Sequence, residues 1–129
     1  MKRSFLRYLI LILILAQYGC TTQKFMQTEL YFGLKQQDGK IIPDSAWNAF
    51  VENYATKTFA QGFTILTSQG WWTDEATKQI HEEPSHVIIS INKMDHQLSK
   101  KIDSLRSVYI ILFNQEAVLR TDKKISVNF

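Results

Sequence analysis

Residues 28–35 read "TELYFGLK", and their alternation decides the fold. An extended chain points successive side chains to opposite faces, so this stretch gathers its large apolar side chains on one face. Those side chains are Leu30, Phe32 and Leu34. Such alternation predicts a half-buried strand, with one face packed on helices and the other face left open.

Further strands are predicted on the C-terminal side of this stretch. "FTILTS" (63–68) and "SHVIISIN" (85–92) predict two of them, the latter rich in β-branched residues. Residues 116–129 predict a last segment, either one bent strand or a small hairpin. Between the second and third strands, "QGWWTDEATKQIHEEP" (69–84) predicts a long polar connection with a turn at Gly70.

Two helices are predicted between the strands. The first follows Asp44 or Ser45, either of which can cap it, and its apolar side chains recur at helical spacing. They are Trp47, Phe50, Val51, Tyr54 and Ala55. Asp95 caps a longer second helix, whose apolar side chains follow at steps of three and four. They are Leu98, Ile102, Leu105, Tyr109 and Leu112.

The order of elements is therefore strand, helix, strand, strand, helix, strand. This is the βαββαβ order of the ferredoxin-like α+β fold, a four-stranded antiparallel sheet with both helices on one face. Right-handed crossovers place the first and third strands side by side in the middle. Because 129 residues suffice for one domain of ordinary size and not for two, we expect residues 28–129 to form a single domain.

A short export leader is predicted ahead of this domain. Lys2, Arg3 and Arg7 precede an apolar run from Tyr8 to Ala16, which spans about 13 Å as a helix. A membrane-spanning helix needs about 20 residues, so this run is too short for a comfortable span. A positive segment, a short apolar segment and then small residues are typical of a secretory signal peptide, here residues 1–19.

The single cysteine, Cys20, stands where such a signal would be cleaved. With the preceding residues, Leu15 to Gly19, it resembles a bacterial lipobox, in which the cysteine is lipidated and becomes the new first residue. The alternatives are an uncleaved N-terminal anchor and a plain signal with an incidental cysteine. Because Thr21 rather than Asp follows, we expect anchoring in the outer membrane through a lipid on Cys20, facing the periplasm. Residues 20–27 would be a short tether.

Composition is typical of a globular domain and argues against one class of partner. Hydrophobic residues make up 45% of the chain and charged residues 21%. The formal net charge of +3 comes from the leader, since the other twelve Lys and Arg equal the twelve Asp and Glu. The domain is therefore neutral, its basic residues are dispersed, and nucleic-acid binding is not expected. One cysteine permits no internal disulfide, so the fold depends on its hydrophobic core.

A series of short patches agrees in order and spacing with one known family. They are "TELYFGL", "DG", Trp47 with Phe50, "GFTIL", Gly70 with Trp72, "EEPSHVIISI", "KIDSLRSVY" and "FNQEAVLR". Over residues 28–129 the chain is similar to domain-of-unknown-function family 3574, small bacterial proteins of which many have lipoprotein leaders. It departs from the family pattern at residues 57–62, where the family has an Arg and prolines. The resemblance implies a single exported domain and no established activity.

The open sheet face is the surface on which we expect function. Glu29 and Tyr31 of the first strand point to it, with Thr64 or Leu66 of the second strand nearby. In the third strand we expect Val87, Ile89 and Ile91 to face the helices, which puts His86, Ile88 and Ser90 on the open face. A carboxylate, a phenol and an imidazole placed together are suited to acid–base chemistry. The alternative is a sheet surface that faces water or a second subunit.

Three other features are weaker candidates. We expect both Trp71 and Trp72 to pack in the core. The alternative, if residues 71–72 are extended, is that one closes the core and the other is exposed and stacks on a sugar or peptide. Glu116 either ends the second helix or faces the same end of the sheet as Glu29. The run His81, Glu82, Glu83 and His86 offers metal-ligand chemistry, but its spacing matches no tight site, so we expect a solvated loop and no metal.

Three functions from different classes fit these observations, and no motif for a cofactor or a catalytic nucleophile is present. We favour a non-catalytic envelope lipoprotein that binds a ligand or partner, or forms a homodimer, through the open face. Its candidate surface comprises Glu29, Tyr31, His86, Ser90, Trp72 and Glu116. The second is a small enzyme that uses Glu29, Tyr31 and His86 in a pocket completed by a second subunit. The third is a structural protein whose only requirement is its membrane anchor.

Overall fold

Strand β1 (Phe25–Gly33) lies inside the sheet, between β3 (Ile80–Asn92) and β4 (Leu119–Ile125). β2 (Thr64–Thr73) borders β3 on its other side, which gives the order β2-β3-β1-β4 with every pairing antiparallel. The computed structural model describes residues 25–128. The predicted α+β architecture is confirmed, and the strand order is that of a ferredoxin-like fold.

The predicted leader (1–19), Cys20 and the tether up to residue 24 lie outside the described residues. Residues 25–27, which the sequence assigns to the tether, already belong to β1, where Gln27 pairs with Ile91 on one side and Lys123 on the other. β1 extends into these residues because they pair with both β3 and β4, although their sequence shows no alternation of apolar and polar residues. Within residues 25–128, no helix is long and apolar enough to cross a membrane.

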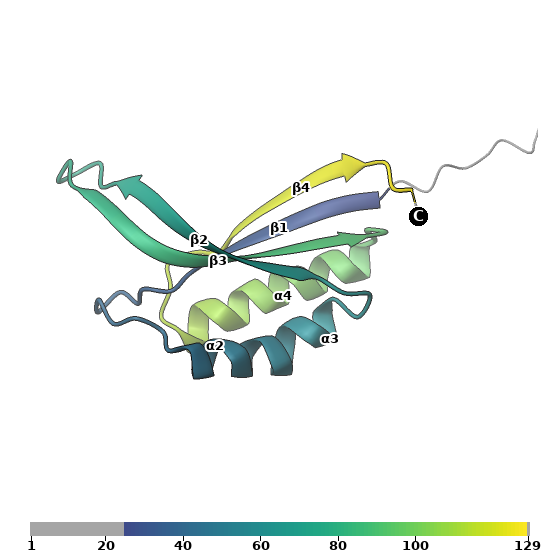
Figure 1. The fold of residues 1–129 in the computed structure, drawn as a ribbon, viewed down its shortest axis with the longest axis horizontal. Coiled ribbons are helices and arrows are strands. Elements are labelled where there is room, and N and C mark those ends of the chain that lie inside the picture. The colour runs from purple at the N-terminus through teal and green to yellow at the C-terminus, as the bar shows by residue number, and fades with distance from the viewer. Residues whose placement is uncertain (1–24, 129) are drawn as a thin grey trace, which may run out of the picture.

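Two helical segments cover one face of the sheet (Figure 1). The first is continuous and consists of α2 (Asp44–Phe50), a π-helical turn η1 (Val51–Ala55) and α3 (Thr56–Thr58). It follows Pro43, with no capping side chain. The second is α4 (His96–Leu112), which begins as predicted after Asp95, whose carboxylate accepts the N–H of Leu98 at 2.7 Å.

The core lies between these helices and the sheet, with Phe32 at its centre. Its ring centroid is 4.7 Å from that of Tyr109 and 5.4 Å from that of Trp47, both in edge-to-face contact. The helical spacing predicts buried positions wrongly near two helix ends. Tyr54 is exposed because the π-helical turn changes the period, and Phe113 is buried where Leu112 was expected.

The faces of β3 are opposite to the prediction. Leu30 pairs with Ile88 and Phe32 pairs with His86, so these side chains share the helix-covered face. The residues on the open face are Val87, Ile89 and Ile91. The sequence misleads here because apolar side chains occupy both faces of the strand, so the alternation does not fix its phase. Only the register with β1 decides it.

Strands β2 and β3 continue beyond the helices as a two-stranded arm (residues 68–85), which Figure 1 shows at the left. The predicted polar connection over residues 69–84 is wrong, because residues 69–73 pair with residues 80–84 and the turn is confined to 74–79. Trp71 is 65% exposed and Trp72 is 51% exposed. Neither closes the core, since the helices do not reach the arm.

The last segment forms one strand rather than a hairpin. Asp122, Lys123 and Lys124 lie within β4 and pair with Thr28, Gln27 and Met26 of β1. β4 is therefore an edge of the sheet, next to the central strand β1.

Candidate functional site

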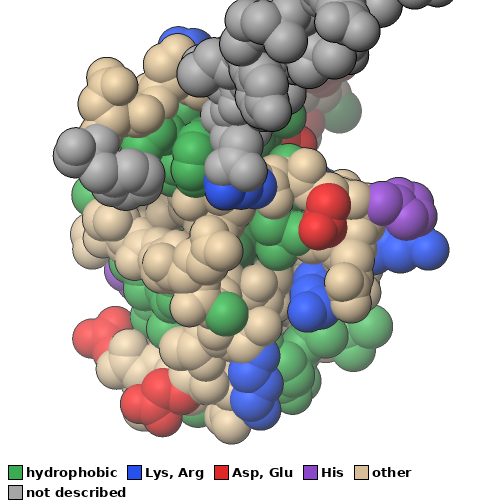
Figure 2. All heavy atoms as spheres, turned by 90° about the vertical axis from the view of Figure 1, so that its right-hand side faces the viewer, with side chains coloured by type: hydrophobic (Ala, Val, Ile, Leu, Met, Phe, Trp, Pro, Cys, Tyr) green, Lys and Arg blue, Asp and Glu red, His purple; other side chains and the backbone are tan. Residues whose placement is uncertain are grey.

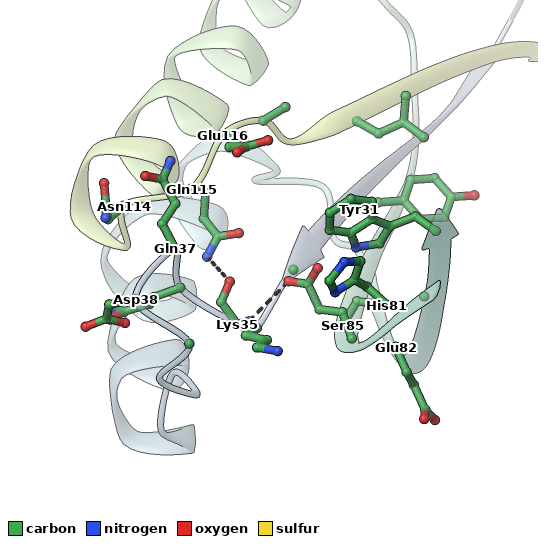
Figure 3. A pocket seen from close by; sticks show the side chains of 18 residues that line it. Tyr31, Lys35, Gln37, Asp38, His81, Glu82, Ser85, Asn114, Gln115 and Glu116 are labelled. Atoms are coloured by element: carbon green, nitrogen blue, oxygen red, sulfur yellow. Dashed lines mark hydrogen bonds between the residues drawn. The ribbon is translucent and has the colours of Figure 1, made fainter. Parts of the chain in front are cut away.

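A cleft of about 1180 Å³ opens on the uncovered sheet face where the arm leaves the body of the molecule. Three chain segments line it (Figure 3): the end of β1 with the turn after it, the base of the arm, and the link from α4 to β4. Their lining residues fall within 31–39, 70–85 and 114–119. The opposite end of the molecule has basic and acidic side chains interspersed over its surface (Figure 2). A concave site built from distant segments is the common form of a small-molecule site.

Gly33 makes a notch in the floor of this cleft. A Cβ at this position would clash with Glu83 Oε1 and would lie 3.1 Å from Gln115 Oε1. The absent side chain therefore lets two oxygen acceptors, one from β3 and one from the link before β4, meet above β1. Tyr109 fixes the floor from below, because its hydroxyl donates to the Gly33 carbonyl at 2.8 Å.

The backbone of Lys35 holds both of these acceptor side chains (Figure 3). Its N–H donates to Glu83 Oε1 at 3.2 Å, and its carbonyl accepts from Gln115 Nε2 at 2.9 Å. Gln115 comes within reach because Asn114 adopts a left-handed backbone conformation (φ 47°) after α4, a conformation that asparagine tolerates well. Since Nε2 is bonded to Lys35, the oxygen of Gln115 is left for the notch.

Trp72 and His81 form an aromatic wall of the cleft. They are partners across the arm, and their rings stack with centroids 4.5 Å apart and planes 20° apart. His81 and Glu83 are alternate residues on the same face of β3, so the wall stands next to the notch. A half-exposed indole whose orientation is fixed by stacking is suited to contact with the apolar part of a ligand.

Tyr31 lines the cleft and is tied to Glu29 on the same face. The Tyr31 hydroxyl donates to the Glu29 carboxylate at 2.6 Å, and Gln27 Nε2 donates to it at 2.8 Å. The bond from Tyr31, followed by that from Gln27, lowers the pKa of Glu29, and the same bond with the carboxylate raises the pKa of Tyr31. The carboxylate is thus a weakened base and the phenol a weakened acid, so the pair is better suited to positioning the Tyr31 ring than to proton transfer.

His86 and Ser90 do not lie on the open face, and the predicted cluster of three catalytic groups is wrong. The His86 ring packs on Trp47 with centroids 4.6 Å apart, and burial lowers its pKa. Its Nδ1 has no hydrogen-bond partner among the described residues. Ser90 is 1% exposed and donates to the backbone carbonyl of Gly62 at 3.0 Å. The sheet itself separates His86 from Glu29 and Tyr31, because Phe32, not Tyr31, is its partner in β1.

The other predicted residues lie near the cleft. Tyr31, Trp72 and Glu116 line it, and Glu29 lies beside Tyr31. The run from His81 to His86 alternates between the two faces of β3, which separates its potential ligands. Within residues 25–128, no three His, Cys, Asp or Glu side chains gather in a way that could hold a metal ion.

The sequence predicts no binding role in a cleft for the residues at its centre. They are Gly33, Lys35, Glu83 and Gln115. One signal was available, because a glycine inside a strand pattern often marks a place where another group approaches the backbone closely. The position of Gln115 had no such signal, since it depends on the turn at Asn114.

The chain belongs to the family described as protein of unknown function (DUF3574), which it matches over residues 27–129. The predicted membership is thereby confirmed. No curated protein matches the chain.

Two solved structures resemble the fold. A phage SAM lyase in complex with S-methyl-5'-thioadenosine has a TM-score of 0.62 and 16% sequence identity, and the match covers 82% of this chain and 84% of that chain. A phage SAM lyase in the apo state has a TM-score of 0.56 and 16% identity, with coverage of 82% and 85%. At this identity the likeness extends to the fold alone.

Proposed function

We propose that this protein is a lipid-anchored binding protein of the cell envelope that takes a small molecule into the cleft at the base of the arm. The observation that carries the proposal is the notch at Gly33, where side chains from distant segments converge beside an aromatic wall. The weakened acid and base at Tyr31 and Glu29 favour binding over catalysis. The leader and Cys20 support an anchor in the outer membrane, facing the periplasm.

Two adjacent tryptophans offer a matched test of the cleft. Trp72 lines it, whereas Trp71 is similarly exposed but faces the other side of the arm. The full-length protein, extracted from membranes in mild detergent, is analysed by native mass spectrometry. We expect a reproducible small-molecule adduct on the wild type and on Trp71→Ala, and its loss from Trp72→Ala. An adduct that persists in Trp72→Ala, or is absent from the wild type, would contradict the proposal.

The anchor has a separate test. Cys20→Ala removes the site of lipid attachment, so radioactive palmitate fed to the cells should label the wild type and not the variant. Label that persists in the variant, or is absent from the wild type, would contradict a lipid on Cys20.

The fold likeness to the phage SAM lyase supports a second candidate, an enzyme acting on S-adenosylmethionine. Such an activity would release S-methyl-5'-thioadenosine, which is readily separated from its precursor by chromatography and mass spectrometry. Release that depends on Trp72 and Glu83 but not on Trp71 would favour the enzyme over the binding protein. Release at the uncatalysed rate would leave binding as the function.

A further inference from the structure

We propose that the ligand of this cleft bears a protonated amine, and that Glu83 is the counter-charge that receives it. The inference rests on the proposed function, because it names the class of ligand for the same cleft. The groups that would contact this amine are those that meet at the notch at Gly33.

The notch offers hydrogen-bond acceptors whose natural partner is a donor with several N–H groups. Among the described residues, the Lys35 N–H is the one hydrogen-bond donor to the Glu83 carboxylate, which leaves most of its accepting capacity unused. The Gln115 oxygen faces the same space, since its nitrogen is bonded to the Lys35 carbonyl. The backbone N–H of Lys35 and the side-chain nitrogen of Gln115 are thus already engaged with protein atoms. An alkylammonium group has three N–H donors and no acceptor, which matches this set.

The charged side chains around the cleft also favour a cationic ligand. In the part of the chain that the structure describes, no Lys, Arg or His lies within ion-pair distance of Glu83, whereas Asp38 at the rim is paired with Lys40 at 2.8 Å. Glu116 adds a further carboxylate to the lining, which also contains the amine of Lys35. A cleft with this balance attracts a cation and disfavours a carboxylate or phosphate ligand.

The aromatic wall sets what lies next to the amine. Trp72 and His81 stand beside Glu83, so the group attached to the ammonium would lie against an indole face or edge. Aromatic rings attract both apolar groups and cations, which suits an aryl- or alkylamine. The ligand class is therefore a small amine with an apolar body.

Three probes with the same phenyl body separate charge from shape: 2-phenylethylamine, 2-phenylethanol and 3-phenylpropionate. Their binding to the full-length protein in mild detergent is followed by the change in tryptophan fluorescence. We expect the amine to bind about tenfold more tightly than the alcohol, as one charge-assisted contact would give, and the carboxylate to bind most weakly. Equal or tighter binding of the alcohol or the carboxylate, or no saturable signal from the amine, would overturn the proposal.

Two glycines of the cleft supply matched variants. A Cβ on Gly33 meets the side-chain ends of Glu83 and Gln115, which can move aside, so Gly33→Ala should fold but lose the amine preference. A Cβ on Gly70 meets only the Glu83 carbonyl oxygen at an ordinary 3.6 Å, so Gly70→Ala should keep the preference. Glu83→Gln retains the shape and removes the charge, so it should bind amine and alcohol alike. An amine preference that survives in Glu83→Gln would contradict the role of Glu83.

The two proposals fail differently. A Trp72-dependent adduct on the isolated protein, together with no preference for the amine probe, overturns the ligand class and leaves ligand binding in the cleft intact. Absence of both the adduct and any probe binding overturns both.

Discussion

The two faces of this sheet carry the same types of side chain, but one face is buried under the helices and the other is open. On the covered face, Leu30 is fully buried against the helices and Ser90 is bonded within the core. On the open face, Leu66 is 48% exposed, and Ser85 exchanges a hydrogen bond with Ser68 at 2.8 Å at the edge of the cleft. The face of the sheet on which a side chain lies, rather than its residue type, therefore decides whether it stabilises the core or lies on the open surface.

Leucine truncation on each face should give the largest difference. Leu30→Ala removes a fully buried side chain and leaves a cavity, so it should lower the free energy of unfolding by about 2–5 kcal/mol. Leu66→Ala on the half-exposed open face should cost less than about 1 kcal/mol. Urea unfolding followed by circular dichroism measures both. Similar costs at the two positions would mean that the open face is covered in solution, as in a homodimer.

Replacing a serine on each face should give a smaller difference in the free energy of unfolding. Ser90→Ala leaves the buried side-chain nitrogen of Asn92 without its acceptor and removes the bond to the Gly62 carbonyl, and should cost about 1–3 kcal/mol. Ser85→Ala should stay within about 0.5 kcal/mol, because water can replace the bond to Ser68. The same unfolding experiment checks both. Equal costs would break the assignment of Ser90 to the covered face.

Tyr31→Phe should have the smallest effect on stability and a clear effect on titration. It removes the bond that chiefly lowers the pKa of Glu29, so this pKa should rise toward its ordinary value of 4.5. A lowered folded-state pKa contributes stability that is present above the unfolded-state pKa and is lost as pH falls through the folded-state pKa. The variant should therefore lose less stability than the wild type below pH 4.5. NMR titration of the Glu29 carboxyl carbon measures the shift, and an unchanged pKa would contradict the role of the Tyr31 bond.

Local patterns predict the fold well where one face is apolar and the other is not. Alternation in β1 and the cap at Asp95 both signal their elements directly, and the order of elements then fixes the strand order. The phase of β3 is beyond such reasoning, because its apolar run fits both faces. The arm is missed because its strands mix polar and aromatic residues without a hydrophobic alternation, so that Trp71 pairs with Glu82 and Trp72 with His81.

The candidate site is predictable only in part. Tyr31 and Trp72 can be found because an open face and an exposed aromatic ring have local signals. Glu83 and Gln115 meet at Gly33 only through the bend of the arm and the left-handed turn at Asn114, which are properties of the folded chain. The same register that brings them together moves His86 and Ser90 to the other side of the sheet.

Amide hydrogen exchange on the full-length protein, compared as isolated and after its small-molecule ligand is removed, would locate the ligand on the fold. If the cleft binds the ligand, removal should speed exchange within residues 31–39, 70–72, 81–85 and 114–119, and leave residues 26–29 and 87–91 unchanged. Exchange that changes instead along residues 26–29 and 87–91 would mean that the open face, covered by a partner or a second copy, is the site. No change anywhere would contradict a bound ligand altogether.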